Sequence, residues 1–226
     1  MGNLESWHLG ASQGQPVQDT SSIQLGCAHL GRLRHVCAFF GNDDEAYRVL
    51  LPFIADGFSA GDKAIHIGRE DRQDTHIDRL SKAGIDVQAA YASGQLELRS
   101  NVETYLSDGK FDGDRMAAAF EEMASAEGSP IRRIVCEMDW ATERPALIEQ
   151  VIQFEARVND VWSRHDDVVI CVYDVTKVSG DMLIDIMRTH PLVLIGDTLH
   201  ENPFFIPPDQ FLRGRVARKN GVSADA

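Results

Sequence analysis

The sequence has few basic residues for its length of 226: 22 Lys and Arg stand against 35 Asp and Glu, giving a formal net charge of −13. A chain this acidic repels nucleic-acid backbones and anionic membrane surfaces. It contains no apolar run near the ~20 residues that span a bilayer and no apolar signal segment at its N-terminus. These absences predict a cytoplasmic protein with no direct nucleic-acid partner and no membrane partner.

Cysteine is also scarce. Only four cysteines are present, and no two of them form a C-x-x-C pair. This spacing argues against a zinc knuckle and against a thioredoxin-type redox motif. Cys37, Cys136 and Cys171 lie in apolar, strand-like runs, where a reduced cysteine behaves as a small hydrophobic residue. We therefore expect three core thiols in a reducing compartment.

The motif that holds nucleotide phosphates is missing as well. A phosphate loop needs glycines and a lysine between the first strand and the first helix. Here that turn runs Phe40-Gly-Asn-Asp-Asp-Glu45, and its three acids would repel a triphosphate. No nucleophile-elbow motif supports serine hydrolase chemistry. The sequence thus predicts no catalytic residues and no enzyme activity.

Apolar strand-like runs alternate regularly with amphipathic helical segments along the chain. This order is typical of right-handed βαβ crossovers and predicts a three-layer αβα fold of the α/β class, with helices on both sides of a mainly parallel sheet. We expect a flexible segment over 1–30, one domain over 31–212 and a flexible basic tail over 213–226. The predicted strands span 35–40, 63–68, 95–99, 131–138, 168–174 and 192–195.

Candidate binding residues gather at the ends of the predicted strands. Ligands of open parallel sheets bind beyond the carboxyl ends of the strands. In this sequence those positions concentrate acids and aromatics, a mixed lining that suits a small molecule. The candidate residues around the predicted strands are Phe40, Glu137, Trp140, Tyr173, Asp174 and His190.

One carboxylate falls on the apolar face of a predicted helix. Glu155 lies within a stripe of that helix, which consists of Val151, Phe154, Val158 and Trp162. A buried carboxylate needs a partner or a raised pKa. Two interpretations stay open: a structural bond to a backbone group or an arginine, or a place in the wall of a ligand pocket.

Metal ligation is the alternative for the buried histidines and cysteines. His35 and Cys37 share a face of the first predicted strand, and His66 lies on the next strand in sequence. Cys136 and Cys171 could join them. The spacing specifies no such site, and histidines and cysteines inside strands are usually core residues. We therefore predict neither a metal nor a cofactor.

Several motifs in order carry a family resemblance. They are His35-Val-Cys-Ala-Phe-Phe, Glu137-Met-Asp-Trp-Ala, Phe154-Glu-Ala-Arg-Val-Asn, Cys171-Val-Tyr-Asp and His190-Pro191. Together they resemble the MEDS domain, the methanogen/methylotroph DcmR sensory domain, over about residues 33–212. The resemblance implies a RecA/KaiC-like core that has lost its phosphate loop. It also implies that the motif positions His35, Glu137, Trp140, Glu155, Tyr173, Asp174 and His190 line a ligand pocket.

The resemblance implies a non-catalytic sensory domain. It would bind a small, apolar metabolite in a closed pocket near Trp140 and Tyr173, and would signal in transcriptional regulation through a partner protein. That partner would be a kinase, an anti-sigma factor or a transcription factor, and homodimer formation is left open. Two alternatives remain: a degenerate nucleotide-binding module without hydrolysis, and a ligand-free interaction module of a sigma-factor or two-component pathway.

Overall fold

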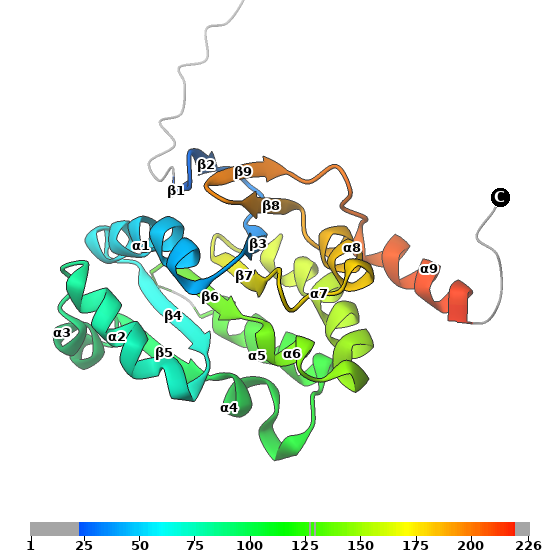
Figure 1. The fold of residues 1–226 in the computed structure, drawn as a ribbon, viewed down its shortest axis with the longest axis horizontal. Coiled ribbons are helices and arrows are strands. Elements are labelled where there is room, and N and C mark those ends of the chain that lie inside the picture. The colour runs from blue at the N-terminus through cyan, green and yellow to red at the C-terminus, as the bar shows by residue number, and fades with distance from the viewer. Residues whose placement is uncertain (1–22, 127, 129, 220–226) are drawn as a thin grey trace, which may run out of the picture.

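The computed structural model describes residues 23–126, 128 and 130–219, and within them a seven-stranded sheet has the order β5-β4-β6-β7-β3-β8-β9 (Figure 1). Neighbouring strands are parallel except β8 and β9, which are antiparallel. The strands of this sheet are β3 (His35–Phe40), β4 (Lys63–Gly68), β5 (Leu96–Ser100), β6 (Arg132–Glu137), β7 (Val168–Asp174), β8 (Leu192–Ile195) and β9 (Thr198–Glu201). The predicted strands are confirmed to within one or two residues, and β9 is an addition.

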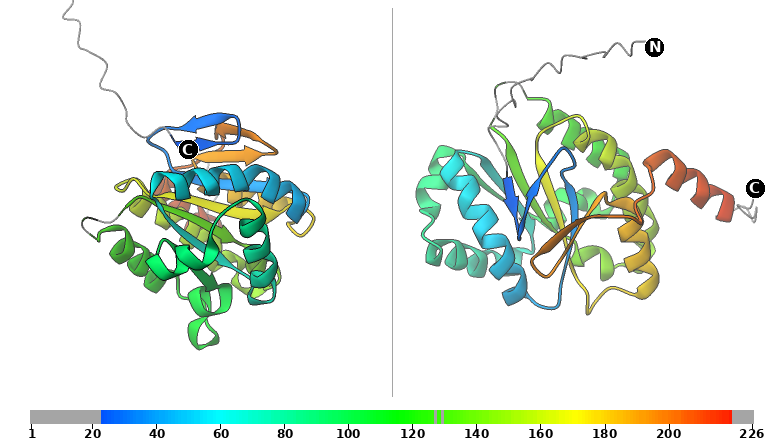
Figure 2. Two further views of the ribbon diagram at one scale, coloured as in Figure 1. Left: turned by 90° about the vertical axis from the view of Figure 1, so that its left-hand side faces the viewer. Right: turned by 90° about the horizontal axis from the view of Figure 1, so that it is seen from above.

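Helices cover both faces of the sheet. Their bounds are α1 (Asp43–Ala60), α2 (Gln73–Lys82), α3 (Val87–Ser93), α4 (Asn101–Tyr105), α5 (Gly113–Ala124), α6 (Asp139–Thr142), α7 (Ile148–Trp162), α8 (Gly180–Thr189) and α9 (Pro208–Lys219), with short 3-10 turns η1 (Glu70–Arg72), η2 (Ser107–Gly109) and η3 (Pro145–Leu147). Figure 2 shows the sheet between two helical layers, which confirms the three-layer α/β prediction. Among the described residues, no helix is long and apolar enough to span a membrane.

Each face of the sheet has its own hydrophobic core. Successive side chains of a strand point to opposite faces, so β3 contributes Val36 and Ala38 to the core under α1, α2 and α3, and Cys37 and Phe39 to the core under α5, α7 and α8. All six residues of β3 are buried. This burial on both sides explains the unbroken apolar runs in the sequence.

Helix α1 is capped at both ends. The side chain of Asn42 caps it by accepting a hydrogen bond from the Glu45 amide at 2.9 Å. At its other end the helix continues past Gly57 to Ala60 and ends at Gly61, whose φ is 82°. Gly57 serves packing instead, because a Cβ there would lie 2.6 Å from Cδ of Arg133.

The N-terminal prediction is wrong for residues 23–30. Strands β1 (Ile23–Leu25) and β2 (Ala28–Leu30) form an antiparallel hairpin that packs against α1. Its apolar side chains are buried, with Leu25 0% exposed, and the Cys27 amide donates to the Asp197 carbonyl at 2.9 Å. Isolated apolar residues without a period gave no signal for this short hairpin. Residues 1–22 lie outside the described part of the chain.

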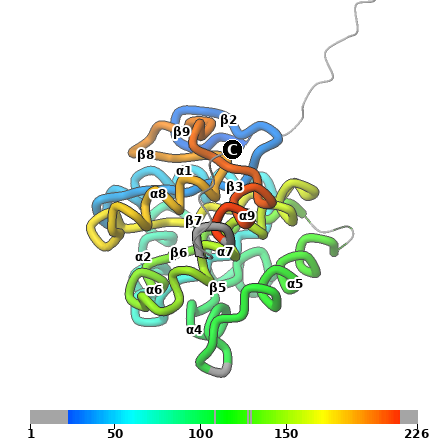
Figure 3. The backbone as a smooth tube through the Cα atoms, turned by 90° about the vertical axis from the view of Figure 1, so that its right-hand side faces the viewer, coloured from blue at the N-terminus to red at the C-terminus, as the bar shows by residue number. Residues whose placement is uncertain are grey.

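At the C-terminus, α9 extends into the range predicted to be a flexible tail and continues through Lys219. It packs against α7 and α8 (Figure 3). Phe211 is 2% exposed, and Arg215 pairs with Asp185 at 2.6 Å and also with Glu149. Arg215 of this basic segment therefore pairs with one acid on α7 and one acid on α8. Residues 220–226 lie outside the described part.

Candidate functional site

A cleft opens at the carboxyl ends of β3, β4, β6 and β7, on the face of the sheet covered by α1 and α2. Its cavity volume is about 80 Å³, which gives room for a ligand of a few heavy atoms. The lining is mostly apolar. The apolar residues that line it are Phe40, Ala46, Leu50, Ile54, Ile67, Leu98, Val135 and Val172.

A chain of three polar side chains also lines the cleft. The Tyr47 hydroxyl lies 2.7 Å from Nδ1 of His76, and Nε2 of His76 lies 2.7 Å from Nδ1 of His66. Burial lowers the pKa of His76 to about 4. Burial, reinforced by His76, holds the pKa of His66 well below its usual value. Both rings are therefore neutral at pH 7, and the chain ends at Nε2 of His66, which has no hydrogen-bond partner among the described residues.

The acids of the cleft differ in how they are held. Asp139 lies 2.5 Å from Nζ of Lys177, and Asp174 accepts hydrogen bonds from the amide and hydroxyl of Thr176 at 2.9 and 2.6 Å. Glu137 accepts a long hydrogen bond of 3.4 Å from the amide of Arg69. Burial raises the pKa of Glu137. Of these three acids, Glu137 therefore has the weakest hydrogen bonding to neighbouring groups.

The turn after β3 offers little to a phosphate. The Gly41 amide donates to Oε2 of Glu45 at 2.7 Å, and the Glu45 amide donates to Asn42. Arg72 pairs with Asp43 at 2.9 Å, and Arg79 pairs with Asp44 at 2.6 Å. The amides of Gly41 and Glu45 and the arginines beside them therefore already have partners within the chain.

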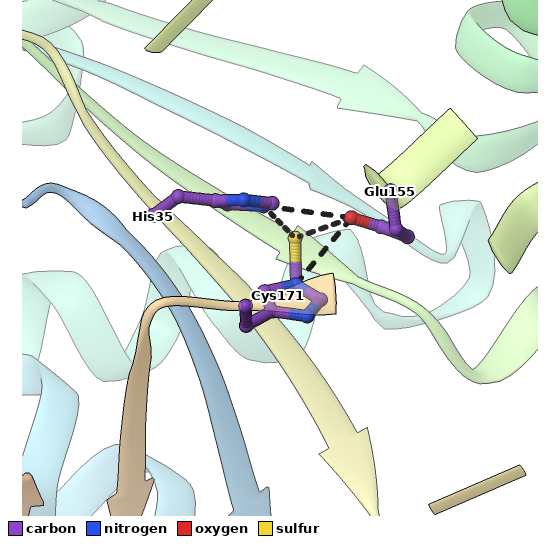
Figure 4. A group of neighbouring side chains, drawn as sticks. His35, Glu155 and Cys171 are labelled. Atoms are coloured by element: carbon purple, nitrogen blue, oxygen red, sulfur yellow. Dashed lines mark hydrogen bonds and ion pairs between the residues drawn. The ribbon is translucent and has the colours of Figure 1, made fainter. Parts of the chain in front are cut away.

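A second polar group lies on the opposite face of the sheet. It consists of His35 on β3, Glu155 on α7, Cys171 on β7 and His190 between α8 and β8, all buried. Figure 4 shows the first three pointing toward one another. Nε2 of His35 and Nε2 of His190 each lie 3.4 Å from Oε2 of Glu155. We refer to these four residues as the buried cluster.

Histidines are the ionic partners of Glu155, where the sequence suggested a backbone group or an arginine. Burial raises the pKa of this carboxyl, but hydrogen bonds with His190 and His35 outweigh burial and lower the pKa to about 2. Burial, reinforced by His190, lowers the pKa of His35. Because the two rings lie 4.2 Å apart between centroids, they cannot both be positively charged at low cost.

The eight predicted site residues fall in three places. Phe40, Glu137, Tyr173 and Asp174 line the cleft, and His35, Glu155 and His190 belong to the buried cluster. Trp140 lies in neither, because α6 turns its ring into the core, where it stacks on Tyr105 with centroids 4.9 Å apart. The cleft therefore borders Tyr173, as expected, but Trp140 does not line it.

Sequence reasoning missed the polar chain of the cleft. Tyr47 and His76 lie inside α1 and α2, away from the strand ends, and they meet because these helices pack side by side. His66 was weighed as a metal ligand together with His35, but the two lie on opposite faces of the sheet and on strands that are not neighbours. Tyr173 adjoins both sites, since its hydroxyl also lies 3.5 Å from Oε1 of Glu155.

The fold is that of an α/β domain of the KaiC-like type, with a cleft at its strand ends. A KaiC-like protein from Pyrococcus horikoshii OT3 is similar, with a TM-score of 0.51, 11% identity, and 77% of this chain and 80% of that chain covered. The flagellar accessory protein FlaH from Methanocaldococcus jannaschii gives a TM-score of 0.44 at 13% identity over 78% of this chain and 84% of that chain. The likeness to the Pyrococcus protein, at 11% identity, shows the fold alone.

Residues 34–191 match the family described as MEDS, the MEthanogen/methylotroph, DcmR Sensory domain, and the chain belongs to that family. The resemblance found in the sequence is thereby confirmed. The transcriptional repressor DcmR of Methylorubrum extorquens is a distant relative. It is 23% identical over 185 residues, which are 80% of this chain and 67% of that protein.

Proposed function

We propose that this chain is a sensory domain that binds a small, uncharged and largely apolar molecule in the cleft and reports its presence to a partner protein in transcriptional regulation. Membership in the MEDS family and the likeness to a transcriptional repressor support a regulatory role. The observation that carries the proposal is the cleft itself, a largely apolar cavity lined in part by His66, whose buried Nε2 has no hydrogen-bond partner among the described residues. The proposed function includes no catalytic step.

The lining limits the chemistry of the ligand. A volume of about 80 Å³ holds only a few heavy atoms. The apolar walls favour an uncharged molecule, because an ion would lose its hydration without gaining polar interactions of equal strength. His66 and Glu137 offer the polar contacts. We therefore expect a compact ligand with one hydrogen-bonding group.

The route to a partner would run through α1 and α2. A ligand at His66 would touch the polar chain that joins β4 to both helices through His76 and Tyr47. It would thereby change how α1 and α2 sit on the sheet, and a partner could recognise their outer surfaces. A kinase, an anti-sigma factor or a transcription factor would each fit such a role.

Nucleotide binding is the rival function, and the turn after β3 argues against it. Its amides bond to Glu45 and Asn42, and it carries three acids. We expect isothermal titration with ATP and Mg²⁺ to give no heat of binding. A measurable heat without hydrolysis would favour the rival.

Native mass spectrometry of the gently purified protein tests the sensor proposal. We expect an organic molecule to be retained by the natural chain and released on denaturation. Ala46→Phe should abolish retention, because Ala46 lines the cleft and a phenyl group there would fill it. Ala60→Phe is the matched control, since it makes the same exchange at an exposed position of the same helix.

Two results would contradict the proposal. One is retention of the same molecule by Ala46→Phe and Ala60→Phe alike, which would place it outside the cleft. The other is the absence of any organic molecule from all three folded chains, which would favour a ligand-free interaction module.

A further inference from the structure

The structure assigns a second binding site to the buried cluster: we infer that His35, Glu155, Cys171 and His190 together bind one divalent cation of the zinc class. Their side chains come from β3, α7, β7 and the segment before β8, so the ion would join four elements that are far apart in sequence. The site lies across the sheet from the cleft and stands independently of the proposed sensor function.

The spacing of the four ligand atoms fits a single tetrahedral ion. Oε2 of Glu155 lies 3.4 Å from Nε2 of each histidine and 3.7 Å from Sγ of Cys171. Sγ of Cys171 lies 3.5 Å from Nε2 of His35. Zinc bonds of about 2.0–2.3 Å in tetrahedral geometry place nitrogen, oxygen and sulfur ligands about 3.4–3.6 Å from one another. The ligand atoms of the remaining pairs lie within 4.8 Å of one another, so His190 would have to move inward for one ion at the centre to reach all four atoms.

The outer nitrogens of both rings are held as donors. Nδ1 of His35 lies 2.9 Å from Oδ1 of Asn159. The orientation of that amide follows from its nitrogen, which donates to the carbonyls of Glu155, Ala156 and Thr189 at 2.9, 3.1 and 2.6 Å. Oδ1 must therefore accept from the ring of His35.

His190 is oriented in the same way. Its Nδ1 lies 2.8 Å from the carbonyl oxygen of Ile186, which can only accept. With protons on Nδ1, both rings would present the lone pair of Nε2 to an ion in the cluster. Histidines that ligate metals have this arrangement, with the far N–H held by a carbonyl or carboxylate. Oε1 of Glu155, the oxygen away from the cluster, faces the Tyr173 hydroxyl at 3.5 Å.

Hydrogen bonds within the chain leave this cluster incomplete. Nε2 of His190 is buried and has no hydrogen-bond partner among the described residues, although it faces the carboxylate of Glu155. One proton can form a hydrogen bond between only two of these four ligand atoms. A cation, in contrast, coordinates both nitrogens, the carboxylate and the sulfur together. The residues are almost inaccessible to solvent, which is typical of a closed structural site with four protein ligands.

The ligand types select the ion. Two imidazoles, a carboxylate and a thiolate form a borderline-soft set that suits Zn²⁺ and its spectroscopic substitute Co²⁺. Mg²⁺ and Ca²⁺ prefer oxygen ligands and higher coordination numbers. The neighbouring thiol Cys37 lies on the same face of β3 but bonds to the Leu192 carbonyl at 3.5 Å, so it is outside the set.

Cobalt absorption spectroscopy on the full chain, reduced and stripped with a chelator, tests the site. We expect one Co²⁺ per chain with the intense visible bands of tetrahedral coordination and a sulfur-to-cobalt charge-transfer band, all bleached by Zn²⁺. Cys171→Ser should remove the charge-transfer band, whereas the matched control Cys37→Ser should retain it. Asn159→Ala, which frees the ring of His35, should weaken Co²⁺ binding by about 10–100-fold.

The titration of the natural chain keeps the inference falsifiable even if a variant fails to fold. Folded protein that shows no tetrahedral cobalt spectrum would overturn it, as would a charge-transfer band that survives Cys171→Ser. Equal loss of the band from Cys37→Ser would also overturn it. Metal analysis of the gently purified chain should find close to one zinc per chain, and Ala46→Phe should keep that zinc because the cleft is separate.

Discussion

Glu137 is the residue whose ionisation the cleft controls through burial. Its pKa is raised above that of an exposed glutamate, with Arg72, Asp139 and Asp43 as the charged groups nearby. The folded protein therefore keeps the proton to a higher pH than the unfolded chain. By linkage, the free energy of unfolding falls as pH rises from the unfolded pKa, about 4.3, through the folded one.

We predict that Glu137→Gln removes this part of the pH dependence. Glutamine stays neutral and can still accept from the Arg69 amide, so the variant should be more stable than the natural protein at pH 7 and match it near pH 4. Urea unfolding at several pH values measures the difference. A difference between the two proteins that is the same at every pH would contradict this assignment.

Glu155 shows which properties of a residue the local sequence pattern predicts and which it does not. The 3.6-residue period places Glu155 on the buried face of its helix, and the structure agrees, since it is 1% exposed. The period contains no information on its partners. His35 and His190 come from segments 120 residues before and 35 residues after it, and only the packing of α7 on the sheet brings them within 3.4 Å.

The N-terminal hairpin is one of the elements that local pattern missed. Each of its strands has three residues, too short for an alternation to be recognised. Its stability comes from α1 and from the turn before β9, which are contacts the sequence does not reveal. The hairpin therefore belongs to the core under α1, which also contains Ile23 and Leu30.

We predict that Leu25→Ala lowers the free energy of unfolding by about 2–5 kcal/mol, because it leaves a cavity at a fully buried position. His29→Ala in the same hairpin removes an exposed side chain and should change it by less than about 0.5 kcal/mol. Denaturant unfolding of the two variants measures both values. Similar small effects would mean that the hairpin contributes nothing to the core.

At the scale of the whole molecule, net charge sets which partners the chain can meet. The formal charge of −13 repels phosphate backbones at long range. We predict that the chain does not retard duplex DNA in a gel-shift experiment at low salt. Retardation that weakens as salt is added would contradict this, because it would reveal a basic surface that the overall composition conceals.

Local sequence pattern was enough for six strands of the seven-stranded sheet and for the α/β class, because each depends on periodicity and turns within a few residues. It was also enough to exclude a phosphate loop, since that motif is contiguous. The division of the candidate residues between two sites was decided only by the tertiary structure. Alternate residues of one strand face opposite layers, so His35 and Phe40 of β3 serve different sites. Which helices meet them depends on strand order and crossovers, which no local pattern encodes.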